Sequence, residues 1–369
     1  MGRGMGNGTT GWVPPHCPNP NCRYFNASED PWPFKRKGFY TRRPRDRRIQ
    51  RFTCLACKRN FSCQSFAVSY WQKRPELIPR IFMMAVGGMA NRQIAHALGC
   101  SHSTVAHHIA RLGRHCLLLQ ARELERLPAL HEIAIDGFET FEWSQYFPFH
   151  HNVAVDVETG YFLYHTDSPL RRKGRMTERQ KARRAELEAT LGKPSPNAVE
   201  TGVRGLLEAI TSGQRTITVR SDDHRAYPRA IRALNCEITH QITSSKERRD
   251  KRNPLWEVNL LDLMIRHSTA AHKRETIAYA KRRQGSIDKL AMFQVWRNTM
   301  KRRWEKGTRV TSAMLLGLAK RPWRVRDILT ERIFYDKVAL SPCWDRYYRR
   351  EVKTAALAVN RTHTLTYAF

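Results

Sequence analysis

Apolar residues recur with a helical period between residues 76 and 119. The recurring positions are Ile81, Met84 and Ala85, then Ile94, Ala95 and Leu98, then Val105, Ile109 and Leu112. Apolar residues three and four positions apart are typical of the buried face of an α-helix, so the pattern predicts three helices. Within segment 91–111 a turn containing Gly99 and an N-cap serine separate two of them, which predicts a helix-turn-helix.

Residues 131–166 show a different pattern, that of strands. Segments 131–136 and 151–156 each end in an aspartate, and the turn at 158–160 leads into the apolar segment 161–165. We expect three adjacent antiparallel strands here. After an amphipathic helix near 197–210, the β-branched segment 216–222 predicts a further strand that ends in Asp222.

These elements predict an α+β multidomain protein. The order strand, strand, strand, helix, strand, helix, strand, helix is the ribonuclease-H-like arrangement, a mixed sheet flanked by helices. We expect a zinc ribbon at 1–70, a helix-turn-helix DNA-binding module at 71–130 and a ribonuclease-H-like catalytic domain at 131–300. A basic insertion near 171–193, expected to be a solvated helix, interrupts that domain, and a basic extension follows at 301–369.

The first sixty residues lack a helical period and contain two short cysteine pairs. The four thiols are those of Cys17, Cys22, Cys54 and Cys57. Four thiolates at such spacings can close a tetrahedral Zn²⁺ site in a domain too small for its own core. The alternative is four ordinary cysteines, with His16 or Cys63 irrelevant or substituting as ligands.

The chain has 65 Lys and Arg against 33 Asp and Glu, a net charge of +32, which indicates a polyanionic partner. Segment 35–51 holds nine basic residues and one acid, and we expect phosphate contacts there from Arg42, Arg43, Arg47 and Arg48. The second helix of a helix-turn-helix enters the major groove, so the expected contacts there are His102, Ser103, His107, His108 and Arg111. A solvated loop and plain helix packing are the alternatives.

The candidate chemistry lies with three acids. Asp136 and Asp222 each end a predicted strand, and Glu257 lies on the apolar face of a helix that begins near Asn253 and Pro254. Burying an ionised, unpaired carboxylate is costly, so a metal or a basic side chain must compensate Glu257. Three carboxylates can hold two Mg²⁺ or Mn²⁺ ions, which prefer hard oxygen ligands. Turn capping by the aspartates and an ion pair for Glu257 are the alternatives.

This triad, with the cysteine pairs and the helix-turn-helix ahead of it, resembles the DDE transposases of small bacterial insertion sequences. The resemblance covers roughly residues 16–300. The stretch Ser221-Asp-Asp-His-Arg-Ala-Tyr227 looks like the end of the second-acid strand in that family, and Trp256-Glu-Val-Asn-Leu-Leu-Asp-Leu-Met-Ile-Arg266 is similar to its third-acid helix. Asp223 beside Asp222 leaves open which of the two touches metal.

The resemblance implies an enzyme that cuts and joins double-stranded DNA, namely an element's terminal repeats and a target, as a homo-oligomer on that DNA. A DNA-binding regulator or a domesticated remnant without catalysis is the alternative, although the acids are intact. No apolar run approaches the roughly 20 residues that cross a bilayer, and no secretory signal is evident, so we expect a cytoplasmic, nucleoid-associated bacterial protein without a membrane partner.

Overall fold

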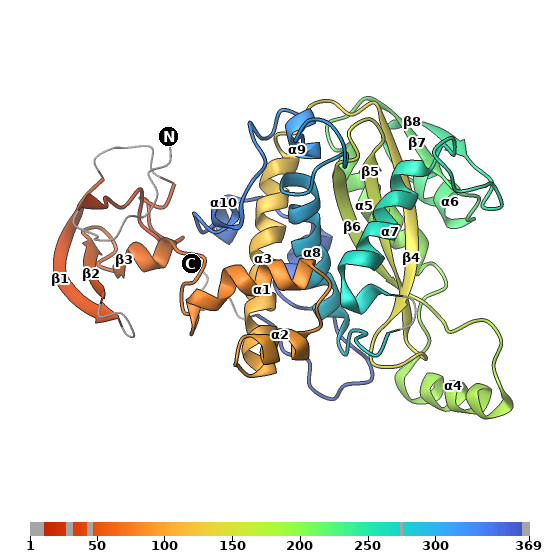
Figure 1. The fold of residues 1–369 in the computed structure, drawn as a ribbon, viewed down its shortest axis with the longest axis horizontal. Coiled ribbons are helices and arrows are strands. Elements are labelled where there is room, and N and C mark those ends of the chain that lie inside the picture. Colours follow the sequence, from red (N-terminus) through yellow and green to blue (C-terminus); the bar gives the residue numbers. More distant parts are fainter. Residues whose placement is uncertain (1–10, 27–31, 43–46, 274–275, 364–369) are drawn as a thin grey trace. The chain divides into compact units, whose positions relative to one another are not determined.

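The computed structural model describes residues 11–26, 32–42, 47–273 and 276–363, and these form two compact units (Figure 1). The first unit comprises the chain up to Arg80 together with Arg324–Ala339. The second comprises Ile81–Trp323 and Leu340–His363. This division differs from the predicted domains, because the helix-turn-helix belongs to the same unit as the large sheet. The stretch predicted as a separate extension beyond residue 300 contributes to both units.

The first unit contains a small antiparallel sheet in the order β1-β2-β3. Its elements are β1 (Phe34–Arg42), β2 (Arg47–Cys54), β3 (Asn60–Ser62), the 3₁₀ turns η2 (Cys63–Phe66), η3 (Pro75–Leu77) and η5 (Tyr335–Lys337), and the short helix α10 (Val325–Ile328). Aromatic rings fill its core: Phe61 stacks on Trp32 and on Phe52 at centroid distances of 5.8 and 5.7 Å. These rings and the four cysteines form one buried cluster, which explains how so short a segment has a core.

The predicted helix-turn-helix is present as α2 (Asn91–Ala97) and α3 (His102–Leu124), preceded by α1 (Ile78–Val86). Gly99 has a φ of +57°, a left-handed conformation that glycine adopts without strain, and it makes the turn. Ser101 caps α3 by accepting a hydrogen bond from the backbone N–H of Thr104 at 3.2 Å. The three predicted helices are confirmed, and α3 continues without interruption to Leu124.

The second unit is built on a five-stranded mixed sheet in the order β6-β5-β4-β7-β8. Its strands are β4 (Glu132–Phe141), β5 (Pro148–Asp156), β6 (Phe162–Pro169), β7 (Thr216–Ser221) and β8 (Glu237–Ile242). The first three are antiparallel neighbours, as predicted, and Gly160 (φ +63°) makes the turn into β6. Strand β7 adds beside β4 in parallel, and β8 adds beside β7 in parallel.

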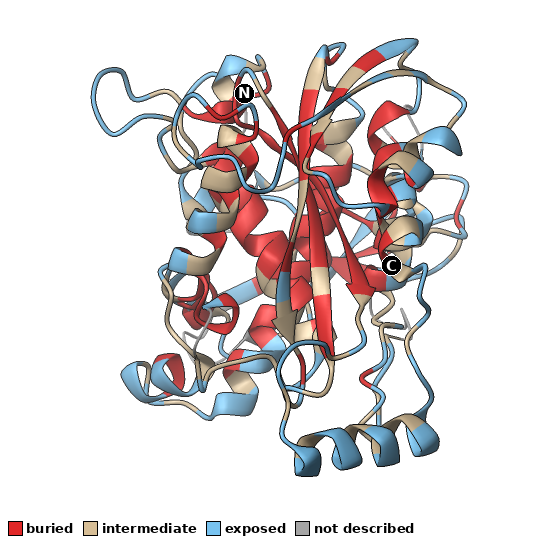
Figure 2. Cartoon of the chain, turned by 90° about the vertical axis from the view of Figure 1, so that its right-hand side faces the viewer, coloured by how far each residue is buried: buried red, intermediate tan, exposed pale blue. Residues whose placement is uncertain are grey.

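Helices cover both faces of this sheet, and buried residues gather in these layers (Figure 2). Helix α5 (Ala198–Thr211) packs on β5 and β6 and contacts α6 (Ala226–Arg232). On the other face, α7 (Trp256–Ser268) packs on β4 and β5, and α8 (Arg283–Thr299) packs along α3. Val258, Leu261 and Ile265 of α7 are buried against Ala134 and Phe138 of β4, an apolar contact that fixes the rotation of α7 about its axis.

The remaining elements of the second unit are α4 (Glu178–Leu191), η4 (Ala270–His272), α9 (Ser312–Leu315) and α11 (Pro342–Tyr348). Helix α4 has no buried residue, in agreement with the solvated helix predicted for the basic insertion. Among the described residues, no helix is both long enough and apolar enough to cross a membrane.

A buried ionic cluster fastens the start of α8 to the ends of two strands. Arg283 donates from Nη2 to Glu142 at 2.7 Å and from Nη1 to Asp167 at 2.8 Å. The hydroxyl of Tyr347 donates to the other oxygen of Asp167 at 2.6 Å. All three charged side chains are at most 12% exposed, so the carboxylates need compensation of their charge. Arg283 supplies most of it, and Arg346 approaches Asp167 at 3.8 Å.

Candidate functional site

Two predicted acids meet at the junction of β4 and β7. The parallel register pairs Ala134 with Arg220, and continuing it by two residues places Asp136 level with Asp222. Neighbouring strands stand roughly 4.8 Å apart, and residues level with each other in a parallel pair point to the same face. Asp136 shares its face of β4 with Ala134 and Phe138, the residues that α7 covers. The two carboxylates therefore point toward α7.

The third acid of the site comes from α7 and is Asp262. Asp136, Asp222 and Asp262 line one cavity of about 780 Å³, which we call the acidic cavity; the exposed Glu139 also lines it. Apolar side chains including Trp256, Leu260 and Leu263 complete part of its wall. The phenol of buried Tyr227 on α6 has a pKa raised well above its ordinary value by burial and by the charges of all three acids, consistent with their convergence.

Glu257, the predicted third acid, is not among the residues that line this cavity. Its carboxylate pairs with the guanidinium of Arg303 at 2.7 Å, and both side chains are largely buried. The sequence analysis named an ion pair as the alternative for Glu257, and the structure has that ion pair. The physical reason is rotation: Glu257 and Asp262 lie about 140° apart around the helix at 100° per residue, so only one of them can face the cavity.

The sequence analysis did not identify Asp262 as a candidate. A signal for it was present in the sequence. Val258 and Ile265 lie four before and three after Asp262, and both are buried against the sheet. Because Asp262 is next to these two residues on the helix surface, it lies close to β4, the strand that carries Asp136.

Burial disfavours the ionised forms of the carboxyl groups in the acidic cavity. Desolvation, with a contribution from Asp222, raises the pKa of Asp136 to about 6, even though the backbone N–H of Gly137 donates to its Oδ1 at 2.7 Å. Desolvation and the charge of Asp136 raise the pKa of Asp262 well above its ordinary value. The Oδ1 atom of Asp262 is enclosed, and none of the described residues donates a hydrogen bond to it. An enclosed acceptor beside a second carboxylate is where a cation would be stabilised.

Basic residues stand around the same cavity. Arg249, Arg266, His267 and Lys273 all line it. Arg266 is held in place, because it donates to the backbone carbonyls of His272 and Glu139 at 3.3 Å each. Carboxylates and basic side chains thus line the same cavity, an arrangement that suits the binding of a cation together with a phosphate.

The neighbouring Asp223 has a different role from Asp222. Asp222 lines the acidic cavity, whereas Asp223 does not. The exposed Asp223 accepts a hydrogen bond from the backbone N–H of Ser245 at 3.3 Å, and the hydrogen bonds from Ser245 lower its pKa. Of the two adjacent acids, Asp222 is therefore the candidate for the site, and Asp223 anchors the loop that follows β8.

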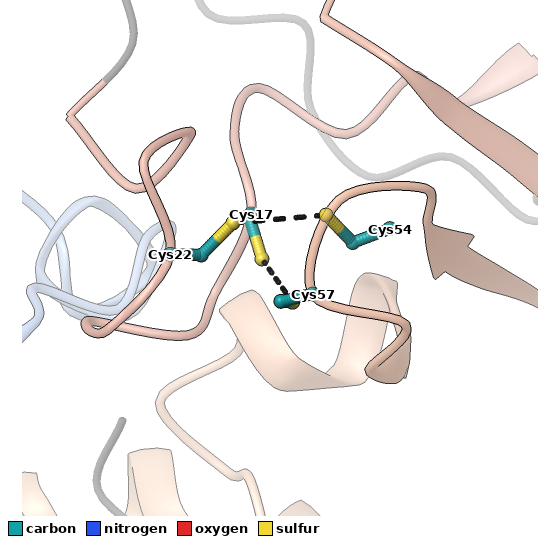
Figure 3. Close-up of side chains that lie close together, drawn as sticks. All are labelled: Cys17, Cys22, Cys54 and Cys57. Atoms are coloured by element: carbon teal, nitrogen blue, oxygen red, sulfur yellow. Dashed lines mark hydrogen bonds between the residues drawn. The ribbon is translucent and has the colours of Figure 1, made fainter.

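The four cysteines of the first unit form a compact cluster (Figure 3). Their sulfur atoms all lie within 4.8 Å of one another, with Cys17 to Cys57 at 3.6 Å and Cys22 to Cys54 at 3.7 Å. Four sulfurs about 2.3 Å from a tetrahedral Zn²⁺ would stand about 3.8 Å apart, so the cluster could hold zinc. Elsewhere in the described chain no three Cys, His, Asp or Glu residues bring ligand atoms that close, and the three acids share a cavity without such proximity.

The predicted DNA contacts on α3 divide into two groups. His102, Ser103 and His107 are exposed at the start of the helix, where a groove contact is possible. His108 and Arg111 are only 2% and 9% exposed. These two predictions are wrong, because α3 packs along α8 and its covered side belongs to the interior of the second unit.

The basic hairpin of the first unit is partly described. Arg48 is exposed and its guanidinium lies 4.6 Å from the ring centroid of Phe39, which is itself exposed. Arg42 and Arg47 are ladder partners at the end of the β1–β2 pair, and their side chains lie outside the described part of the chain, as does Arg43 altogether. A cation over an exposed aromatic ring presents a flat, charged surface that suits a phosphate backbone.

Comparison with known proteins identifies the small helical module. Residues 80–115 match the family model of bacterial regulatory proteins of the luxR family, which covers α2 and the first half of α3. The chain therefore carries a DNA-binding helix-turn-helix. No curated protein matches the chain.

One similar solved chain comes from the simian T-cell lymphotropic virus intasome in complex with the PP2A regulatory subunit B56 gamma. It has 15% sequence identity and a TM-score of 0.23, and the match spans 54% of this chain and 58% of that one. The match is thus confined to little more than half of either chain.

Proposed function

We propose that this protein is a transposase that cuts DNA at the ends of an insertion element and joins those ends to a target. The observation that carries the proposal is the convergence of Asp136, Asp222 and Asp262 on one cavity. The strand order β6-β5-β4-β7-β8, with acids on the central strand and after its parallel neighbour, supports the ribonuclease-H-like interpretation. The helix-turn-helix supplies the binding to duplex DNA that such an enzyme needs.

Asp136, Asp222 and Asp262 would hold Mg²⁺ or Mn²⁺. Their fit rests on the hard carboxylate oxygens and on the enclosed, unbonded Oδ1 of Asp262. When bound, a pair of such ions activates the attacking oxygen and stabilises the leaving oxygen of an in-line phosphoryl displacement.

The chain's own residues have three tasks in this scheme. The exposed start of α3 and the basic hairpin around Arg48 bind duplex DNA. The three acids hold the metal ions beside the reacting phosphate. The buried Glu257–Arg303 pair keeps α7 in the rotation that presents Asp262. Zn²⁺ held by the four cysteines would fix the ribbon of the first unit, and assembly on paired DNA ends would bring two acidic cavities to one target.

The experiment combines a binding assay and a cleavage assay on the same variants. Duplexes taken from both flanks of the gene are incubated with the protein and MgCl₂ or MnCl₂, and nicked and joined products are resolved on a gel. We expect Asp262→Asn and Asp222→Asn to bind these duplexes like the natural protein and to lose cleavage. Asp223→Asn is the matched control, because it removes an adjacent acid outside the cavity, and it should keep cleavage.

A second candidate function is a DNA-binding regulator without catalysis. The observation in its favour is that the matched family model describes bacterial regulatory proteins. The same assay separates the two functions. A regulator would bind the flanking duplexes and yield no metal-dependent product with any variant, whereas a transposase yields product that depends on Asp262.

A further inference from the structure

A basic loop joins β8 to α7 beside the acidic cavity. Hydrogen bonds hold it near both ends: the backbone N–H of Ser245 donates to Asp223, and the amide of Asn253 donates to the carbonyl of Arg248 at 2.9 Å. The backbone N–H of Asn253 also donates to the carbonyl of Asp250 at 3.1 Å. The loop therefore has a defined course, and it presents Arg249 to the cavity.

Several arginines near this end of the sheet are held by ion pairs or hydrogen bonds, whereas Arg249 acts on Asp136 and Asp262 through its charge. Arg220 pairs with Glu132, Arg248 pairs with Asp250, and Arg266 donates to two backbone carbonyls. For Arg249 the described part of the chain offers neither an ion pair nor a hydrogen bond, although it lines the cavity and is exposed. Its guanidinium remains available to a ligand.

An anionic substrate in the acidic cavity needs such a group. A DNA phosphate that approaches three carboxylates is repelled unless cations offset the charge, and a guanidinium can donate two parallel hydrogen bonds to phosphate oxygens. The loop fixes the backbone of Arg249 in advance, so little reorganisation is needed when the phosphate arrives.

We propose that Arg249 is the substrate-positioning residue of the acidic cavity, binding the non-bridging oxygens of the DNA phosphate that lies over Asp136, Asp222 and Asp262. The expected effect of Arg249 on DNA cleavage rests on the proposed function. The expected effect on DNA binding requires only that duplex DNA enters the cavity. Lys273 lines the cavity as well, but a lysine ammonium lacks the planar fork that fixes a phosphate in one orientation.

The test compares Arg249→Gln and Arg249→Lys with the matched control Arg248→Gln, which removes the neighbouring charge outside the cavity. In the cleavage assay, with a duplex that the natural protein cuts, we expect Arg249→Gln to lower kcat about a hundredfold. Arg249→Lys should recover part of this loss, and Arg248→Gln should stay within about twofold. A purely structural role would not give rescue by lysine.

A second measurement does not depend on cleavage. The affinity for the same duplex is measured with CaCl₂ at several salt concentrations. Loss of one phosphate contact reduces the slope of log affinity against log salt by about one, which we expect for Arg249→Gln and not for Arg248→Gln. Equal slopes and equal rates for these two variants would overturn the proposal. Absence of cleavage by every protein, with the difference in slope intact, would instead refute the proposed function and leave the phosphate contact standing.

Discussion

Replacing Asp136 by asparagine tests whether the ionised carboxylate of Asp136 lowers the free energy of unfolding. The pKa of Asp136 rises from an ordinary 3.8 to about 6, mainly through burial. One unit corresponds to about 1.4 kcal/mol, so the ionised side chain costs the folded state at most about 3 kcal/mol. Some of this is lost to solvent screening because the residue is only half-buried. Since asparagine keeps an acceptor for the Gly137 N–H, we expect Asp136→Asn to be more stable by about 1–3 kcal/mol.

The pH dependence of that gain follows from the direction of the shift. An acid whose pKa is raised in the folded state does not affect stability below its unfolded pKa. Its cost to the folded state grows as the pH rises from the unfolded pKa to the folded pKa, and it is complete above the folded pKa. The gain should therefore be complete above pH 6 and vanish near pH 4. Urea unfolding of both proteins, dialysed free of Mg²⁺, at pH 7.5 and pH 4 measures it as a difference in midpoint at constant slope.

Added Mg²⁺ should narrow the difference in stability between the two proteins. A ligand that binds only the folded state at ten times its Kd stabilises it by about 1.4 kcal/mol, so 10 mM Mg²⁺ should stabilise the natural protein and leave Asp136→Asn unchanged if Kd is about 1 mM. Glu257→Gln is the control, and it should lower the stability that Asp136→Asn raises. It weakens the buried pair with Arg303, and it should cost about 1–3 kcal/mol while the response to Mg²⁺ stays intact. The reasoning fails if Asp136→Asn is the less stable protein at pH 7.5. It also fails if Glu257→Gln abolishes the response to Mg²⁺.

Three further predictions concern other parts of the molecule. Arg283→Met removes the main counter-charge of the buried carboxylates of Glu142 and Asp167, and we expect a loss of about 3–5 kcal/mol in urea unfolding, whereas an unchanged midpoint would contradict the role of this cluster. Burial lowers the pKa of His165 to about 4 and that of His272 to about 3, so stability should be full above pH 6.5 and fall as the pH drops toward 4, by up to about 3 kcal/mol for His165. Equal unfolding midpoints at pH 7.5 and pH 5 would disprove this. Cys54→Ser should reduce bound zinc, measured by atomic emission, from about one ion per chain to near zero, and retention of a full equivalent would exclude the four-cysteine site.

Local patterns accounted for much of this fold. The helical period, Gly99 and the capping serine predicted the helix-turn-helix, because turn and cap preferences depend on neighbouring residues. The strands β4 to β7 were evident from their apolar segments and from the turn at Gly160. The cysteine spacing predicted a cluster of four thiols for the same reason, since each pair closes a short loop of its own.

Features set by long-range packing were out of reach. The expected order of elements included a fifth strand, but its position could not be assigned, because β8 lies at the edge of the sheet and most of its residues are exposed. The burial of His108 and Arg111 depends on packing within the second unit, with segments distant in the sequence. Likewise, nothing local indicates that residues 324–339 belong to the same unit as the first eighty residues.

The choice between Glu257 and Asp262 shows why hydropathy alone could not locate the third acid. Helix α7 packs one apolar side against the sheet, while Leu260 and Leu263 on another side form the wall of a cavity, so the helix has no single polar stripe. In such a helix every acid is next to apolar residues, and burial by itself carries no information about function. What distinguishes the two acids is charge compensation. Glu257 has a guanidinium at 2.7 Å. For Asp262, burial and the charge of Asp136 raise the pKa well above its ordinary value, and the opposing charges of Arg266 and Arg249 do not offset them. The proposed cation would be stabilised where the protein leaves negative charge incompletely compensated, and of Glu257 and Asp262 that condition holds at Asp262.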